Sequence, residues 1–157
     1  MMTTFTPLPL LLALSIAAAA IVPAAPAYAA EAPTAAPVEK VSVRSTAHFD
    51  LNQAAVRLDD QSRLLAEVAK MQDVTWQAVS VTGHTDSTGS PALNRRLAQR
   101  RAGSVKTFLV GKGVDGSIID TGAKASDAPV APNDTPTGRA KNRRTEVVFR
   151  GVRAVAR

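Results

Sequence analysis

The stretch that decides the fold runs from residue 74 to residue 110 and reads VTWQAVSVTGHTDSTGSPALNRRLAQRRAGSVKTFLV. Its first part, Val74 to Thr82, is rich in β-branched residues, and Val79 and Val81 fall on one face of an extended chain. This pattern predicts a strand, which Gly83 ends. The first expected element is therefore a strand that leads into a glycine-bounded loop.

The second part of the same stretch predicts a helix. Ser90 can cap its N-terminus, and Pro91 suits the first turn, where a missing N–H removes no helical hydrogen bond. Gly111 and Gly113 favour a stop, so we expect the helix to end near Val110.

The flanking sequence adds further strands and helices. Residues 41–49 are expected to form a strand and residues 50–53 a loop. A helix follows, with Asp59 or Asp60 as its N-cap and with Leu64, Leu65, Val68 and Met71 at helical spacing. Beyond the opening stretch we expect a strand at 117–121, a long loop at 122–137, a helical turn at 138–143 and a last strand at 145–150. Strands that alternate with helices predict an α+β fold, in which the helices cover one small sheet.

Composition limits what the chain can be. Its 157 residues suit one domain, and the absence of cysteine excludes disulfide frameworks, thiol nucleophiles and an acylated-cysteine lipid anchor. The two histidines, His48 and His84, provide little for a metal site, so we expect no metal and no cofactor. The net charge of +6 lies entirely beyond residue 30, where only four aromatic residues occur, and this thin core disfavours a large enzyme.

The N-terminal segment is typical of a secretory signal. Residues 10–22 are uncharged, but this run is shorter than the roughly 20 residues that span a bilayer. Ala-Tyr-Ala at 27–29 suits signal peptidase. We expect a signal peptide at 1–29, an Ala/Pro-rich linker at 30–40, a domain at 41–151 and a basic C-terminal tail at 152–157. The mature chain would lie in the periplasm or at the outer membrane, without a transmembrane span. The alternative is an uncleaved anchor, because no Lys or Arg precedes the apolar run.

Arg101 does not fit a purely structural helix. The expected apolar stripe of this helix consists of Leu93, Leu97, Val105 and Phe108. Arg101 falls on that stripe, and Asn94 lies seven residues earlier on nearly the same face. A guanidinium in this position is expected to reach solvent or to meet an anion, unless its stem simply packs at the edge of the core.

The loop at 83–89, Gly-His-Thr-Asp-Ser-Thr-Gly, places one carboxylate between two glycines. Asp86 can cap the backbone in an Asx turn, or it can form a charged pair with Arg101. Such a pair can bridge directly or receive a small zwitterion, and the residues alone leave both interpretations open.

Residues 138–146, Gly-Arg-Ala-Lys-Asn-Arg-Arg-Thr-Glu, are densely basic. A basic run of this kind can bind nucleic acid. The secretory segment and the lack of aromatic residues among the cations, which would stack on bases, argue against a nucleic-acid partner. The arginines are instead expected to anchor the preceding loop or to bind carboxylates.

Three motifs in this order resemble the OmpA-like C-terminal domain, the peptidoglycan-binding domain of the OmpA, MotB and Pal proteins. They are GHTDSTG at 83–89, NRRL at 94–97 followed by RA at 101–102, and GRAKNRR at 138–144, together with Phe49-Asp50. The resemblance covers residues 41–151 and implies a βαβαβ-type sheet with helices packed on one face.

The resemblance also implies a ligand and its contacts. The ligand would be the diaminopimelate-containing stem peptide of peptidoglycan, held non-covalently, with Asp86 on its ammonium group and Arg101 on its carboxylate. Supporting contacts would come from Asp50, Asn52, Thr85, Asn94 and Arg143.

These residues imply a stand-alone binding module that contributes to envelope integrity or anchoring, with other envelope proteins as further partners. An enzyme is disfavoured because His84 and Asp86 have no nucleophile or metal-ligand set beside them. The remaining alternative is an envelope adaptor that binds a protein partner or anionic lipid through its basic surface. An adaptor of that kind would tolerate substitution of Asp86 and Arg101.

Overall fold

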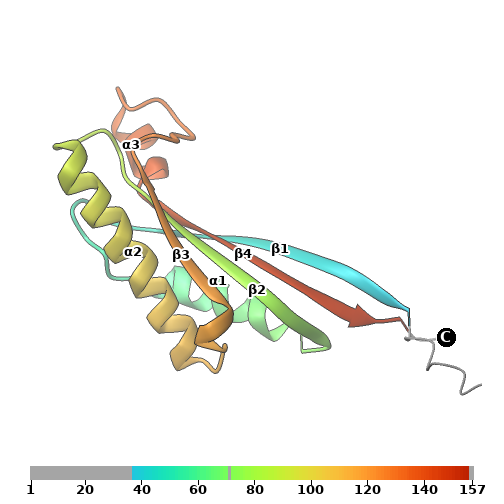
Figure 1. The fold of residues 1–157 in the computed structure, drawn as a ribbon. Helices are drawn as coiled ribbons and strands as arrows, with labels where there is room; N and C mark the ends of the chain where they lie inside the picture. Colours follow the sequence, from blue (N-terminus) through green and yellow to red (C-terminus); the bar gives the residue numbers. More distant parts are fainter. Residues whose placement is uncertain (1–36, 71, 156–157) are drawn as a thin grey trace, which may run out of the picture. The chain divides into compact units, whose positions relative to one another are not determined.

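The computed structural model describes residues 37–70 and 72–155, which form one mixed sheet with the two longer helices packed on it (Figure 1). The elements follow in the order β1 (Val38–His48), α1 (Leu58–Ala69), β2 (Val74–His84), α2 (Pro91–Gly111), the 3₁₀ turn η1 (Gly116–Ile118), β3 (Ile119–Ala125), α3 (Pro136–Asn142) and β4 (Arg144–Ala154). The α+β class and the βαβαβ-type sheet predicted from the sequence are confirmed.

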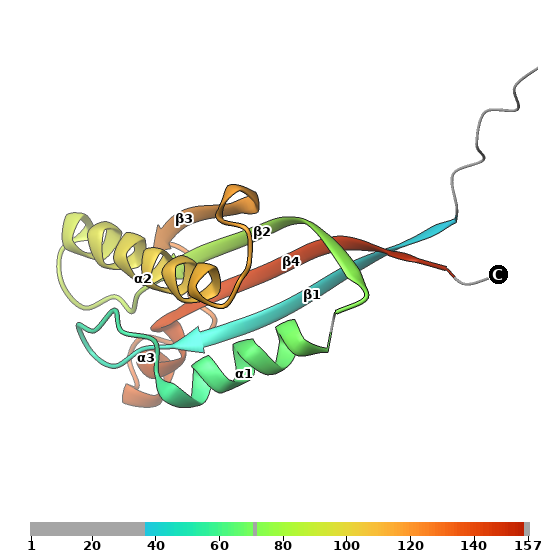
Figure 2. The ribbon, with the colours of Figure 1, turned by 90° about the horizontal axis from the view of Figure 1, so that it is seen from below.

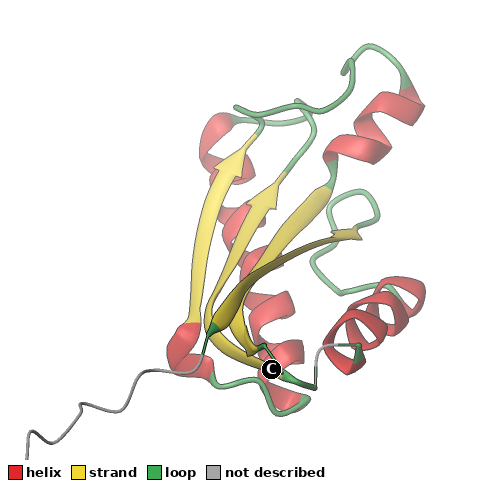
Figure 3. Ribbon diagram, turned by 90° about the vertical axis from the view of Figure 1, so that its right-hand side faces the viewer, coloured by secondary structure: helices red, strands yellow, loops and turns green. Residues whose placement is uncertain are grey.

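The sheet has the strand order β1-β4-β2-β3. β4 pairs antiparallel with both β1 and β2, whereas β3 pairs parallel with β2 at the edge. Figure 3 shows the common twist of the strands. Because the last strand lies between the first and the second, the sheet is complete only when the C-terminal residues are in place.

One apolar core lies between the sheet and the helices α1 and α2. Its buried members include Val79, Val81, Val147 and Phe149 from the sheet, Leu64 from α1, and Val105 and Leu109 from α2. Figure 2 shows α1 beside β1 and α2 beside β2 and β3. A buried carboxylate also fixes α1, because Asp60 accepts a hydrogen bond at 3.0 Å from the backbone N–H of His48.

The outer ends of two strands extend beyond their expected limits. β1 begins at Val38 rather than at residue 41, and β4 continues to Ala154 rather than ending at residue 150. The two strands pair along their whole length, with Val38 opposite Ala154. Pairing with a partner strand therefore orders residues whose own composition predicts no structure.

Helix α1 starts at Leu58, and its N-cap residue Arg57 makes no side-chain cap. The prediction that Asp59 or Asp60 caps this helix was wrong: both lie in its first turn, where a negative charge is favourable near the helix dipole. Met71, which the sequence places on the same helix, lies outside the described residues.

The elements before and after β3 are also shifted. The strand expected at 117–121 is replaced by η1 followed by β3, which continues to Ala125 into the expected loop. α3 starts at Pro136, where Thr135 is the N-cap and accepts a hydrogen bond from the N–H of Gly138. β3 is longer than expected because it pairs in parallel with β2 as far as His84, and residues 122–125 carry no alternating pattern that would predict this.

Candidate functional site

Helix α2 begins at the end of the sheet where β2 stops. The predicted cap is confirmed, because Ser90 Oγ accepts a hydrogen bond at 3.3 Å from the N–H of Leu93. α2 approaches β2 so closely that a Cβ at Gly83 would overlap the carbonyl oxygen of Ala98. Gly83 therefore sets where the helix crosses the strand, and with it where the α2 side chains lie relative to the loop at 85–89.

Arg101 is the largest fully buried side chain of the described residues. Its Nη1 donates to the carbonyl of His84 at 2.8 Å, its Nε to that of Gln53 at 2.9 Å, and its Nη2 to that of Asp50 at 3.2 Å. The guanidinium also lies over the ring of Phe49, with Cζ 5.0 Å from the ring centroid. The expectation that Arg101 reaches solvent was wrong, because the side chain is fully buried and donates to backbone carbonyls. That it meets an anion stays a prediction.

The buried face of α2 differs from the expected stripe. Leu93 is 61% exposed, so its assignment to this face was wrong. The buried residues of α2 are Asn94, Ala98, Arg101, Ala102, Val105 and Leu109. The close contact with Gly83 requires small side chains on the helix, which explains why alanines form part of this face. The placement of Arg101 on it is confirmed.

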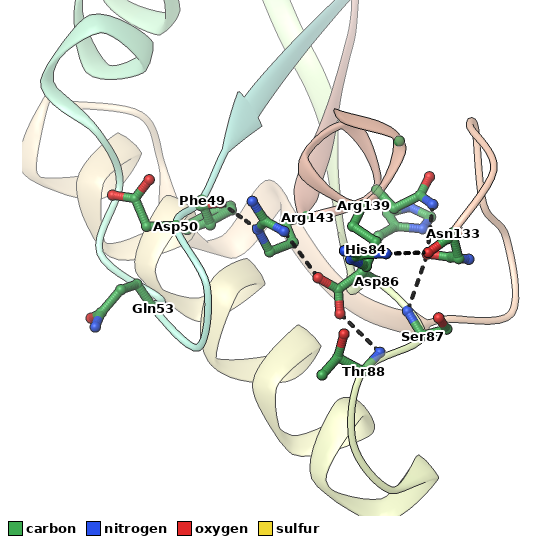
Figure 4. A network of polar contacts seen from close by, with 12 residues as sticks. Phe49, Asp50, Gln53, His84, Asp86, Ser87, Thr88, Asn133, Arg139 and Arg143 are labelled. Carbon is green, nitrogen blue, oxygen red and sulfur yellow. Dashed lines mark hydrogen bonds and ion pairs between the residues drawn. The ribbon is translucent and has the colours of Figure 1, made fainter. Parts of the chain in front are cut away.

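The two carboxylate oxygens of Asp86, a residue only 3% exposed, have different partners. Oδ1 accepts a hydrogen bond at 3.0 Å from the N–H of Thr88, which makes the Asx turn. Oδ2 accepts one at 3.0 Å from Nη1 of Arg143, and Nε of Arg143 donates to the carbonyl of Phe49 at 3.1 Å (Figure 4). Asp86 therefore forms its ion pair with Arg143 and not with Arg101.

Both buried groups are ionised at neutral pH. Burial lowers the pKa of Arg101 to about 10, although the nearby charge of Asp86 opposes this shift, so Arg101 stays a cation at neutral pH. Burial alone would raise the pKa of Asp86, but the hydrogen bonds from Thr88 and Arg143 outweigh it and lower that pKa below its ordinary value. The site thus holds a cation and an anion that do not neutralise each other by direct contact.

Further polar contacts fix the loop at 85–89. Asn94, 5% exposed, donates from Nδ2 to the carbonyl of Asp86 at 3.4 Å. On the other side, the N–H of Ser87 donates to Oδ1 of Asn133 at 3.2 Å (Figure 4). α2 and the segment before α3 therefore both hold the loop that carries the carboxylate.

A cleft of about 1020 Å³ lies between α2, the loop after β1 and the loop at 85–89. Six of the seven residues expected to bind a ligand line it, namely Asn52, Thr85, Asp86, Asn94, Arg101 and Arg143. Asp50 does not: its carbonyl accepts a hydrogen bond from Arg101, and Figure 4 shows its carboxylate directed away from Asp86. Asn52 has a φ of 56°, a left-handed conformation that asparagine tolerates better than most residues.

The cleft has nine other lining residues, which were not expected from the sequence. They are Leu51, Thr88, Gly89, Leu93, Arg95, Arg96, Leu97, Gln99 and Arg100. The sequence does carry a signal for Arg95, Arg96 and Arg100: residues 91–111 include several cations and no acidic residue, which indicates a helix suited to an anionic ligand.

Residues 37–70 and 72–155 contain neither a metal-binding cluster nor a membrane-spanning helix. No three His, Asp or Glu side chains of these residues come together in a group that could hold a metal ion. No helix in this part of the chain combines the length and the apolar character needed to cross a membrane.

The chain is similar to known proteins over most of its described residues. The family model described as OmpA family matches residues 48–143. Outer membrane protein A of Bordetella avium is 38% identical over 115 residues, which cover 73% of this chain and 59% of that protein. Peptidoglycan-binding protein ArfA of Mycobacterium tuberculosis is 41% identical over 98 residues, which cover 62% of this chain and 30% of that protein.

A solved structure has the same fold. The cell wall anchor of the T6SS from Pseudomonas aeruginosa matches with a TM-score of 0.57 and 30% identity, over 76% of this chain and 88% of that one. The chain spans 59% of the length of the Bordetella avium protein and less of ArfA. The matched residues 48–143 include every residue that lines the cleft. The chain belongs to the OmpA family.

Proposed function

We propose that this chain binds peptidoglycan non-covalently and takes the free amino-acid end of diaminopimelate into the cleft beside α2. The main support is that Asp86 and Arg101 line one cleft, are both ionised, and are not paired with each other. Two relatives support the same ligand class, since ArfA is named peptidoglycan-binding and the Pseudomonas aeruginosa protein is a cell wall anchor.

The proposed contacts follow from the chemistry of the ligand. The free end of diaminopimelate carries an ammonium and a carboxylate on one carbon. Each oxygen of Asp86 accepts one hydrogen bond and has a second lone pair, so an ammonium can bind without displacing Thr88 or Arg143. Arg101 has N–H donors left after its three bonds to carbonyls, and these suit a carboxylate.

Access to Arg101 requires a movement. Its side chain has no exposed surface, and the loop at 50–53 covers it through the carbonyls of Asp50 and Gln53. The bond to Asp50 is the longest of the three, at 3.2 Å. We propose that the ligand carboxylate takes the place of this carbonyl, because hydrogen bonds between charged groups are stronger than those to neutral acceptors.

In this proposal the chain is a binding module of the bacterial envelope without catalytic chemistry. It would act in the periplasm or at the outer membrane and attach to the wall whatever it is joined to. Lysine-type peptidoglycan lacks the second carboxylate, so it would leave Arg101 without an anion. Binding to lysine-type peptidoglycan would therefore be weaker, and this difference in affinity would make the chain selective for diaminopimelate.

The Asp86→Asn substitution tests the proposal. It keeps the size of the side chain but removes the charge that would hold the ammonium, so we expect retention on isolated diaminopimelate-type sacculi to fall at least about tenfold. Asp59→Asn is the matched control, because Asp59 is an exposed carboxylate in the first turn of α1 outside the cleft. This control should be retained like the wild type.

Two further measurements show whether Asp86→Asn loses binding without losing its fold, and whether the wild type is selective for diaminopimelate. Far-UV circular dichroism of Asp86→Asn should match that of the wild type, which separates loss of binding from loss of fold. Lysine-type sacculi should retain the wild type poorly. Equal retention of Asp86→Asn and wild type would refute binding through the cleft and favour an adaptor that binds through its basic surface.

A further inference from the structure

Helix α2 has an unusual charge distribution. Its cations are Arg95, Arg96, Arg100, Arg101 and Lys106, and it contains no Asp or Glu. Arg101 is buried, and Nζ of Lys106 donates to the carbonyl of Ile119 at 2.8 Å. The other three, Arg95, Arg96 and Arg100, are here called the arginine triad.

The arginine triad is exposed and has no protein partner within residues 37–70 and 72–155. None of its guanidinium groups takes part in an ion pair or a side-chain hydrogen bond there. Arg96 and Arg100 are four residues apart on the helix, where two like charges destabilise it by roughly 0.2–0.5 kcal/mol. The fold itself makes no use of this concentration of charge.

The triad lines the same cleft as Asp86 and Arg101. The residues lining the cleft include five arginines and one aspartate, a net charge of +4. A zwitterion brings one positive and one negative group, which Asp86 and Arg101 can receive between them. The positive charge of the triad would then stay uncompensated, so the cleft is suited to a ligand with additional negative groups.

We propose that the arginine triad is a second anion site of the cleft, which binds further carboxylates of the ligand besides the one at Arg101. This inference rests on the proposed function. A stem peptide carries such groups on its γ-linked glutamate and at its C-terminus, and a guanidinium can bind a carboxylate through two parallel hydrogen bonds. The chain therefore selects stem peptides with free carboxylates over those with amidated carboxylates.

Calorimetric titration of the purified chain with two synthetic peptides tests this selection. The first is the tripeptide L-Ala-γ-D-Glu-meso-diaminopimelate. The second has the glutamate and C-terminal carboxylates amidated but keeps the free amino-acid end of diaminopimelate. At about 150 mM salt, where charges farther than ~8 Å apart are largely screened, we expect the wild type to bind the free acid about tenfold more tightly.

Variants locate the effect. The triple variant Arg95→Gln/Arg96→Gln/Arg100→Gln should bind both peptides equally, with the affinity of the wild type for the amidated one. Arg44→Gln/Arg57→Gln/Arg150→Gln is the matched control, because it removes three exposed arginines outside the cleft and changes the net charge equally. This control should keep the tenfold preference.

The outcomes separate the two proposals. If the wild type binds both peptides with one affinity, the second anion site is wrong while the proposed function stands. If the control loses the preference as fully as the triple variant, general charge rather than the triad is responsible, which also overturns the inference. If the wild type binds neither peptide, the proposed function fails and the second site fails with it.

Discussion

The middle of the sheet and the end that faces the cleft are built from different kinds of buried residue. In the middle, the buried side chains are apolar, among them Leu64, Val79, Val81, Leu109, Val147 and Phe149. At the cleft end they are polar or charged, among them His84, Asp86, Asn94, Arg101, Asn142 and Thr145. Apolar burial is non-directional, whereas buried polar groups are stable only when specific partners satisfy them. A substitution in the middle should therefore change stability alone, and one at the cleft end should change stability and binding together.

The largest expected effect comes from Gly83, where α2 crosses the sheet between the two regions. In Gly83→Ala, the new methyl group would overlap the backbone of Ala98, so the helix has to move away from the strand. We expect the free energy of unfolding to fall by at least about 3 kcal/mol, as measured by urea denaturation. Gly103→Ala is the control, because a Cβ there meets nothing within 4 Å, and it should gain about 1 kcal/mol from helix propensity. Similar losses in both variants would mean that the close approach is unimportant.

A pair of substitutions compares the two regions directly. Arg101→Met leaves the carbonyls of Asp50, Gln53 and His84 without a donor, and we expect a loss of about 3 kcal/mol. Leu109→Ala in the apolar core should cost a similar ~2–5 kcal/mol. At a temperature where both variants are folded, only Arg101→Met should lose retention on diaminopimelate-type sacculi. Loss of binding in Leu109→Ala as well would show that the two regions are not separable.

The smallest expected effect is the pH dependence contributed by His84. This residue is 1% exposed, and neither ring nitrogen has a hydrogen-bond partner within the described part of the chain. Burial, with the charges of Arg144 and Lys124, lowers its pKa from 6.5 to about 4, although Glu146 opposes the shift. The unfolded chain therefore takes up a proton before the folded one as the pH falls. Between pH 7 and pH 5.5 this should remove about 1 kcal/mol of stability.

Thermal melts of His84→Leu at these two pH values check the assignment. The variant should lose most of this dependence, whereas His48→Gln, which removes the other histidine, should keep it. The contribution of Asp86 does not interfere, because its pKa is lowered and its stabilisation is lost only at lower pH, below the ordinary value of 3.8. If the melting temperature of His84→Leu changes with pH as much as that of the wild type, another group is responsible for the pH dependence.

Local signals explain why α2 could be predicted well and the polar contacts could not. Ser90, Pro91 and Gly111 act on the backbone next to them, so the sequence is enough to bound the helix. The partners of Asp86 and Arg101 come from distant parts of the chain: Arg143 lies 57 residues from Asp86, and Asp50 lies 51 residues before Arg101. No periodicity connects such residues.

The motifs nevertheless predicted which side chains gather at one place, since six of the seven expected residues line the cleft. They did not predict that loop carbonyls would hold Arg101. A carbonyl belongs to every residue, so no residue type marks it in a sequence. Asp50 was expected among the ligand contacts, but it does not line the cleft, and its backbone carbonyl binds Arg101. That these side chains bind a ligand stays a prediction.

The pairing of β1 with β4 has a mechanical consequence. The two strands are joined over eleven residue pairs, from Val38 opposite Ala154 to His48 opposite Arg144. β1 leads into the loop whose Leu51 and Asn52 line the cleft. If the cleft holds a ligand as proposed, a pulling force that enters at Val38 and is resisted at the cleft acts along the axis of β1. The hydrogen bonds of the ladder then carry the load in shear and together, instead of opening one after another.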